Sequence, residues 1–598
     1  MVDIAVGRNA LCPCGSSKKF KRCCGAGSTT AIPVANDVTA VLALLQQGML
    51  TQAERILSEL VKVQPSNPTH HFLSGYAALQ GGHNAQAAAA MGKAIDLGIS
   101  DPAAFYHYGC ALAALDRYSE AAVAFAHALK LKSDFLPARA NLASCQFEML
   151  DFEQAEQNYR QVLEIDPSNI AACHNLGQIF FVTQRLSEAI DYFQRAAEAA
   201  PKVAEFRASL ATMQEAENQL DAADSSARMA LDCEPGNVTA AIALARVLRR
   251  RKRAVEALKV LSAGDLGTCM PRTQIAYWSE RGQVLEVLER YGEAFDAFAQ
   301  SKKRLAETRQ PYNRAATEQA LARERSVLTR ERAKAWALQP QQPGTQAPLF
   351  IVGFPRSGTT LLEQMLGCHS QVVACGELET SIVRESGRPD YPDNLSRLDE
   401  KERQVLLTSL RSDYLAELGR HAGHAPAARY ASDKLPLNLM RIGLIRLLFP
   451  EAKIIHVMRH PLDAVLSAYF TPFLFGNEWS LHMADTAHMF IQTWQHAEAM
   501  RGLAGTQFLR VRYEDLVTNP EPVLKRVLTF LELPWAPECL AFHQSQRIAR
   551  TASYAQVTRK LYQTSKERYR HYLEYIGTET LELLHPVIAE AGYQLKLP

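Results

Sequence analysis

The chain has 598 residues, more than one hydrophobic core usually serves, so we expect two or more domains. Its 65 basic and 63 acidic residues leave a formal net charge of +2, which excludes a global electrostatic reason for nucleic-acid binding. The N-terminus lacks the pattern of a signal peptide, and no apolar run is long enough to span a bilayer. We therefore expect a cytoplasmic protein with no nucleic-acid partner and no membrane span.

Four of the twelve cysteines form a compact cluster near the N-terminus, at Cys12, Cys14, Cys23 and Cys24. Two close pairs of thiolates around a short basic loop can hold a tetrahedral zinc ion, and the metal would supply most of the folding energy of so short a segment. The alternative is a chance cluster in a disordered tail. The cluster resembles the SEC-C zinc motif of many bacterial proteins, which implies structural zinc and a partner-docking module at residues 1–26.

An alanine recurs every 34 residues through the next part of the chain, at Ala53, Ala87, Ala121, Ala155, Ala189, Ala223 and Ala257. Small residues keep a second phase of the same period, and prolines keep a third. Small residues let paired helices approach closely, and a proline stops the second helix of a pair. This is the pattern of the tetratricopeptide repeat, and it predicts an all-α solenoid with connecting helices over residues 37–337.

A solenoid of this kind implies a protein or peptide partner on its concave face; the alternative is a spacer or a dimerisation arm. The repeat pattern weakens after about residue 262, but residues 272–307 still read as a helical pair. The charged stretch 308–337 predicts one or more exposed helices. Residues 338–346, rich in Gln and Pro, predict a linker to the next domain.

Apolar segments alternate with helical ones from residue 347 onward, which predicts an α/β domain with a parallel sheet over residues 347–598. The candidate strands are 348–353, 453–459 and 507–513. The loops that follow the carboxyl ends of such strands meet in one crevice, so we expect a ligand site there.

The loop after the first candidate strand has the spacing of a phosphate-binding loop, with glycines at Gly353 and Gly358. Thr359 occupies the position of the usual lysine, and the loop carries Arg356 instead. A tight loop at a helix N-terminus is a ready anion site. The pattern therefore indicates a P-loop-like phosphate cradle that differs from the cradle of ATPases.

Two further positions bring polar groups to the same crevice. Arg459 ends the second candidate strand, and Ser467 lies about two turns along the helix that follows it. An arginine and a hydroxyl in this arrangement can bind one phosphate together. Lys434 precedes another helix and adds a third cation. Two separate phosphate sites suit a nucleotide with phosphates at both ends of its ribose.

This constellation resembles the sulfotransferases that use 3′-phosphoadenosine-5′-phosphosulfate (PAPS), and especially the tyrosylprotein sulfotransferases and the bacterial repeat-fused enzymes. The matching segments are Pro355–Thr360, Cys375–Glu377, Asp433–Pro436, Tyr513–Val517 and Thr551–Arg559. The resemblance implies PAPS as co-substrate. The donor-binding residues that it implies are Arg356, Ser357, Gly358, Thr359, Thr360, Arg459, Ser467, Tyr513, Ser553 and Arg559.

The same resemblance implies an in-line displacement in which Arg356 and Lys434 neutralise charge on the leaving phosphate. Glu377 is the candidate base that takes the proton of the acceptor. The tyrosylprotein enzymes carry two adjacent glutamates at this place, of which the second is the base, and here Glu379 is the alternative. Because fixed cations neutralise the charge, this arrangement needs no metal.

The sequence thus predicts an enzyme that transfers a sulfuryl group from PAPS to a hydroxyl or amine acceptor, which is a protein, a peptide or a saccharide recruited by the repeats. One alternative is a non-catalytic scaffold that keeps a nucleotide-binding sulfotransferase fold. Another is a nucleotide kinase or NTPase, against which the missing lysine weighs. The identity of the acceptor, the partner of the zinc motif and the oligomeric state remain open.

Overall fold

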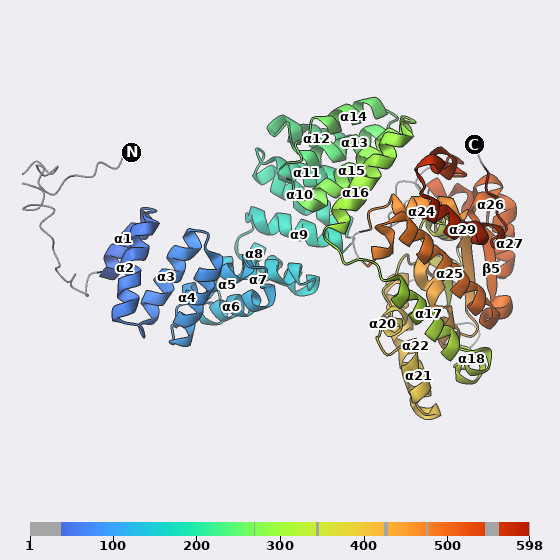
Figure 1. The fold of residues 1–598 in the computed structure, drawn as a ribbon, viewed down its shortest axis with the longest axis horizontal. Helices are drawn as coiled ribbons and strands as arrows, with labels where there is room; N and C mark the ends of the chain where they lie inside the picture. Colours follow the sequence, from blue (N-terminus) through green and yellow to red (C-terminus); the bar gives the residue numbers. More distant parts are fainter. Residues whose placement is uncertain are drawn as a thin grey trace, which may run out of the picture. The chain divides into compact units, whose positions relative to one another are not determined.

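The computed structural model describes residues 37–183, 185–267, 269–341, 346–423, 428–473, 476–544 and 561–596 (Figure 1). The chain divides into two compact units, Met1–Thr183 and Gln184–Pro598. Helical repeats make up the described part of the first unit. The second unit contains further repeats and an α/β domain. The four cysteines of the predicted zinc motif lie outside the described residues.

Helical hairpins follow one another through the first unit. Its helices are α1 (Asp37–Gln46), α2 (Leu50–Val63), α3 (Pro68–Gln80), α4 (Asn84–Asp96), α5 (Pro102–Ala113), α6 (Tyr118–Leu131), α7 (Leu136–Glu148), α8 (Phe152–Ile165) and α9 (Ile170–Val182). The small residues of the repeat are required by close contact between paired helices: a Cβ on Gly109 would lie 2.7 Å from Cε1 of Phe125. Helix α2 ends two residues before Pro65, as the proline phase predicts. The predicted solenoid is confirmed here.

Further hairpins open the second unit. Their helices are α10 (Leu186–Ala199), α11 (Ala204–Ala216), α12 (Leu220–Cys233), α13 (Val238–Arg250), α14 (Ala254–Ser262), α15 (Pro271–Val287) and α16 (Tyr291–Ala306). The last hairpin is the helical pair expected at residues 272–307. Its helices approach as closely as those of the regular repeats, because a Cβ on Gly282 would lie 2.7 Å from Cε1 of Phe298.

The charged stretch after the repeats forms α17 (Arg314–Val327) and α18 (Arg330–Trp336), so the predicted helices are confirmed. We predicted that these helices are exposed, and this prediction is wrong for one of their faces, which is buried. Val327 and Ala333 are buried in the apolar core of the α/β domain, and so is Leu338, at the start of the predicted linker. The N–H of Leu338 also donates to the Leu447 carbonyl (2.8 Å). Spaced apolar residues in a strongly charged segment were enough to dock these helices.

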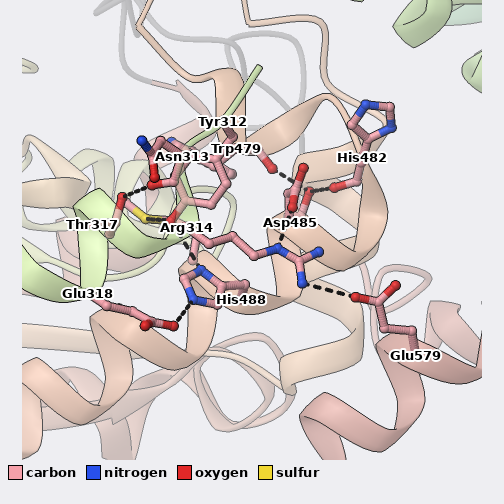
Figure 2. Close-up of polar contacts among 12 residues, drawn as sticks. Tyr312, Asn313, Arg314, Thr317, Glu318, Trp479, His482, Asp485, His488 and Glu579 are labelled. Atoms are coloured by element: carbon pink, nitrogen blue, oxygen red, sulfur yellow. Dashed lines mark hydrogen bonds and ion pairs between the residues drawn. The ribbon is translucent and has the colours of Figure 1, made fainter.

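Figure 2 shows the polar contacts at the start of α17. Arg314 donates to Asp485 Oδ1 (2.6 Å) on α25 (Met483–Ala504) and to Glu579 Oε1 (2.9 Å) on α29 (Thr578–Glu590). Further along α17, Glu318 Oε1 lies 2.7 Å from His488 Nε2, also on α25. The connecting helix is therefore tied to two helices of the α/β domain by charged groups as well as by its apolar face.

The α/β domain is built on a parallel sheet with the order β2-β3-β1-β4-β5. The strands are β1 (Ala347–Val352), β2 (Val372–Ala374), β3 (Tyr430–Asp433), β4 (Lys453–Met458) and β5 (Phe508–Arg512). The three predicted strands correspond to β1, β4 and β5, and the parallel sheet is confirmed. The sequence did not predict the short strands β2 and β3, which extend the sheet beyond β1 on the side away from β4.

Helices cover both faces of this sheet. They are α19 (Thr359–Leu366), α20 (Ser381–Ser386), α21 (Asp393–Arg397), α22 (Glu400–Ala422), α23 (Ile442–Leu448), α24 (Pro461–Tyr469), α25, α26 (Tyr513–Thr518), α27 (Pro520–Phe530) and α29, with the short 3-10 segments η2 (Pro436–Arg441), η3 (Glu478–Ser480), η4 (Gly505–Gln507), η5 (Pro537–Gln544) and η6 (Arg568–Tyr575). Leu349 and Ile351 of β1 pack with α19 and α27, whereas Phe350 packs with α22 and α23. This alternation is what a sheet buried on both faces requires. Among the described residues, no helix combines the length and apolar character needed to cross a bilayer.

Candidate functional site

The loop between β1 and α19 is shaped by its two glycines. Gly358 has φ +98°, and a Cβ on it would lie 2.5 Å from Cδ2 of Tyr513. A Cβ on Gly353 would lie 2.5 Å from the carbonyl oxygen of Val457. Gly358 is also the N-cap of α19, so no side chain of that residue covers the first amide groups of the helix. The predicted cradle has the backbone form of an anion site.

Arg356 lies inside this loop with φ 72°, an uncommon conformation for a residue with a side chain. Its Nε lies 3.4 Å from the Ser467 hydroxyl on α24, so the loop and the second predicted phosphate residue meet. Burial, and then the charge of Arg459, lower the pKa of Arg356 to about 10. The guanidinium therefore remains charged at neutral pH.

Arg459 follows β4 and is only 6% exposed. Its Nη1 donates to the Arg356 carbonyl (3.0 Å), and its Nη2 donates to the Ser565 carbonyl (2.6 Å). Its guanidinium carbon lies 5.0 Å from the ring centre of Tyr513. The buried Nε has no hydrogen-bond partner among the residues that the structure describes. A buried charged donor without an acceptor is costly, so an anionic ligand suits this position.

Lys434 and Glu377 form the second half of the site. Lys434 follows β3, its side chain is fully buried, and its Nζ lies 2.5 Å from Oε1 of Glu377, which is 40% exposed. The lysine N–H donates to the Gly376 carbonyl (2.8 Å). Glu379 is also exposed, and its carbonyl oxygen accepts from Arg384 Nη1 (3.4 Å). Of the two candidate bases, Glu377 is therefore the one next to the buried cation.

The order of the strands brings these parts together at the carboxyl ends of the strands. β1 lies between β3 and β4, so the loop after β1 has Lys434 on one side and Arg459 on the other. A hydrogen bond from the Gly353 N–H to the Pro436 carbonyl (3.1 Å) joins the loop to the lysine segment. Ligands bind at the carboxyl ends of the strands in open parallel sheets.

The remaining predicted donor residues divide into two groups. Ser357, Thr359 and Thr360 are buried at the start of α19, and Tyr513 starts α26 beneath Gly358. Ser553 and Arg559 lie outside the described residues, and their predicted role stays a prediction. The described residues fit a ligand with separated anionic groups, because a glycine cradle and a buried arginine pair lie beside each other.

Comparison with known proteins gives this domain its family. A model described as "Sulfotransferase family" matches residues 348–537, the segment that contains the cradle, both arginines and the Lys434–Glu377 pair. This match covers most of the α/β domain, which is therefore similar to the sulfotransferase family. Tetratricopeptide-repeat models match residues 38–102, 102–135 and 148–213, and a model of the SEC-C motif matches residues 8–26. The chain thus joins an SEC-C motif, tetratricopeptide repeats and a sulfotransferase domain.

Relatives show the same kinship. An uncharacterized protein of Aquifex aeolicus is 33% identical over 40% of this chain and 32% of its own length. A protein-tyrosine sulfotransferase of Drosophila melanogaster is 30% identical over 31% of this chain and 38% of its own length. Protein-tyrosine sulfotransferase A of Caenorhabditis elegans is 25% identical over 41% of this chain and 67% of its own length. The chain thus spans about a third of the length of the first two relatives.

The α/β domain contains two positioning residues that we did not predict, and the first is Glu363. Glu363, on α19, is 2% exposed, and its Oε1 accepts from the Gly376 N–H (2.9 Å) and from the Ser432 hydroxyl (2.7 Å). It thereby fixes the turn that carries Glu377. A glutamate inside the apolar run 361–366 was the available signal, since a charged residue on a buried helix usually has a specific partner.

Asp463 is a second residue that sequence reasoning missed. It lies in the first turn of α24 and is 1% exposed. Its carboxylate oxygens accept the N–H groups of Glu567 and Tyr569, each at 2.8 Å. It therefore holds the chain that returns to the site after residue 560. An acid in a helix's first turn is common, so no local signal marked it.

Proposed function

We propose that the chain transfers a sulfuryl group from PAPS to a hydroxyl acceptor on a protein, a peptide or a saccharide. The observation that carries the proposal is the meeting of a phosphate-binding group and a pair of a buried cation and a carboxylate at the carboxyl ends of the strands. One is the Arg356 cradle with Arg459 and Ser467, and the other is the buried Lys434 beside Glu377. The family of the domain supports sulfuryl transfer, and the arginine pair supports a donor with two phosphate groups.

Each end of the donor has a suitable partner. The amide groups at the start of α19, with Arg356, would hold the 5′-phosphosulfate. The Ser467 hydroxyl and the unpartnered Nε of Arg459 would hold the 3′-phosphate. Bound PAPS supplies an activated sulfuryl group whose leaving group is the 5′-phosphate of the nucleotide.

The chemical step is an in-line displacement at sulfur. The acceptor oxygen forms a bond to sulfur while the bond between sulfur and the 5′-phosphate oxygen breaks, and the acceptor proton passes to the carboxylate of Glu377. Arg356 and Lys434 stabilise the negative charge that develops on the leaving phosphate. The contact between Lys434 and Glu377 supports this division of roles, because it puts the cation and the base side by side.

The repeats would recruit the acceptor, and the SEC-C motif would dock a further partner. Tetratricopeptide repeats commonly bind peptides along stacked hairpins. The relatives named protein-tyrosine sulfotransferases raise tyrosine side chains as acceptors.

The test follows labelled sulfate from PAPS into proteins and into small molecules of a cell lysate. The Arg356→Ala variant should lose transfer, because it removes the cation of the cradle, by ~10²-fold or more. The matched control is Arg429→Ala. Arg429 is an exposed arginine that pairs with Glu532 and precedes β3, so it lies at the amino ends of the strands, away from the site. Transfer that survives in Arg356→Ala would show the proposal to be wrong.

A titration with the product nucleotide, 3′-phosphoadenosine-5′-phosphate (PAP), separates the enzyme from the alternatives. Tight binding of PAP and weak binding of ATP support the sulfotransferase. Tight binding of PAP without transfer to any acceptor would favour the scaffold that keeps the nucleotide site.

A further inference from the structure

The last repeat hairpin, α15 with α16, packs directly on the helix that carries Ser467. Leu285 and Phe298 from the hairpin belong to the same apolar cluster as Leu462 and Leu466 of α24. The rings of Phe298 and Phe470, the residue after α24, stack with centroids 4.0 Å apart. This hairpin is therefore part of the core on which the proposed donor site is built.

Glu286 extends this contact from α15 with charged groups. Its carboxylate accepts from Nε and Nη2 of Arg568, the second at 2.7 Å, and from the Tyr572 hydroxyl (3.1 Å). The neighbours of Arg568 are the two residues whose N–H groups donate to Asp463 on α24. Glu286 thus holds one side of η6 while α24 holds the other.

Lys302, on α16, binds the segment that follows α24. It is 2% exposed, and its Nζ donates to the Thr471 carbonyl (2.7 Å) and to the Ser480 hydroxyl (3.1 Å). The Thr471 hydroxyl in turn donates to the Ser467 carbonyl (2.8 Å). Among the described residues, no carboxylate pairs with this ammonium group. Burial lowers its pKa to about 7, so keeping it inside the protein is costly.

We propose that the last repeat hairpin is a working part of the donor site, with Glu286 and Lys302 as positioning residues that hold α24 from its two ends. They act through Asp463 at the start of the helix and through Thr471 just beyond its end. The inference rests on the proposed donor site. It also makes the repeats a route of control, because a partner that shifts this hairpin would change donor binding.

The test compares Glu286→Gln and Lys302→Met with two matched variants of the same hairpin in the full chain. Glu293→Gln changes an exposed acid that pairs with Arg290, and Lys303→Met changes the exposed neighbour of Lys302. Two quantities are measured for each: hydrogen–deuterium exchange of residues 461–469 without nucleotide, and the dissociation constant of PAP by calorimetry. Exchange of α27, which packs in a different apolar cluster from the hairpin, reports any general loss of stability.

We expect faster exchange in α24 but not in α27 for Glu286→Gln and Lys302→Met. We also expect dissociation constants for PAP raised ~2- to 100-fold, the range of coupling between neighbouring groups. Lys302→Arg keeps the charge and the donors and should restore part of the loss, whatever the stability of Lys302→Met. The two surface variants should behave as the wild type.

Unchanged exchange in α24 overturns the inference. So does faster exchange with an unchanged affinity for PAP, because the hairpin would then position a helix on which the donor does not depend. If the wild type binds no PAP while the exchange of α24 still responds, the hairpin holds the helix and it is the proposed function that fails.

Discussion

At the scale of single residues, the site depends on a few side chains whose surroundings are unusual. Arg356 combines a left-handed backbone with a guanidinium whose pKa burial lowers, and the buried Nε of Arg459 has no hydrogen-bond partner among the described residues. Lys434 is fully buried and meets one carboxylate. Such environments cost stability and are found where a ligand or a reaction makes use of them.

The assignment of the base gives a direct prediction. Glu377→Gln should lower kcat by ~10²–10⁴-fold, since it removes the group that takes the proton. Glu379→Gln should retain most of the activity, because Glu379 does not contact Lys434. Both variants should bind PAP as the wild type does, which calorimetry checks. A larger loss in Glu379→Gln than in Glu377→Gln would exchange the two roles.

The shape of the cradle gives another prediction, about stability. Gly358→Ala should destabilise the domain by about 1–3 kcal/mol, because its Cβ would meet the Tyr513 ring and its φ disfavours any side chain. Gly419→Ala, inside α22 and with nothing within 4 Å of its Cβ, is the control and should be neutral or stabilising. Chemical unfolding measures both. Equal stability of the two variants would contradict the tight packing of the loop.

At the scale of elements, the strand ends decide which side chains meet. β3 is short, yet it puts Lys434 beside the loop after β1. Asp433, its last residue, is fully buried, accepts from the Tyr414 hydroxyl (3.1 Å) and from the Leu435 N–H (3.2 Å), and so shapes the turn into the lysine segment.

Asp433 should make stability depend on pH. Burial raises its pKa from an ordinary value near 4 to about 7, so between these values the folded chain holds a proton that the unfolded chain has lost. Raising the pH across this window therefore lowers the free energy of unfolding. Asp433→Asn removes this proton, and its stability relative to the wild type should be greater at about pH 8 than at about pH 5. An equal difference at both pH values, in chemical unfolding, would contradict the raised pKa.

The repeat elements show the same dependence on neighbours. The 34-residue period predicted the hairpins because each one repeats the same close contact between small and large residues. It did not predict that the last hairpin, whose register differs, packs on α24. That contact joins residues far apart in the chain: Lys302 and Ser480 are 178 positions apart, and Glu286 and Arg568 are 282 positions apart. A period within one segment carries no information about such a partner.

At the scale of the whole molecule, the compact units do not follow the predicted domain boundaries. The second unit begins at Gln184, within the repeats, and contains the sulfotransferase domain as well. The domain boundaries that the sequence predicts remain predictions. They are 1–26, 37–337, 338–346 and 347–598.

The zinc motif gives a prediction for the full chain. The chain should bind about one zinc ion, and Cys14→Ser should lower this content, because a tetrahedral site needs all four ligands. Sulfuryl transfer should survive the loss of zinc, since arginine and lysine side chains neutralise the charge at the proposed site. Metal analysis and the sulfate-transfer assay measure the two effects. Full zinc content in Cys14→Ser would remove this cysteine from the site.

The sequence by itself determined the features that local pattern carries. The repeat period, the α/β alternation and the glycine spacing of the cradle all depend on residues close together in the chain, where geometry follows from spacing. Only the tertiary structure decided which carboxylate lies next to Lys434, which segments Glu363 and Asp463 bind, and that the last repeat hairpin packs against α24. These contacts join residues brought together by strand order and helix packing, and for that reason no local pattern reveals them.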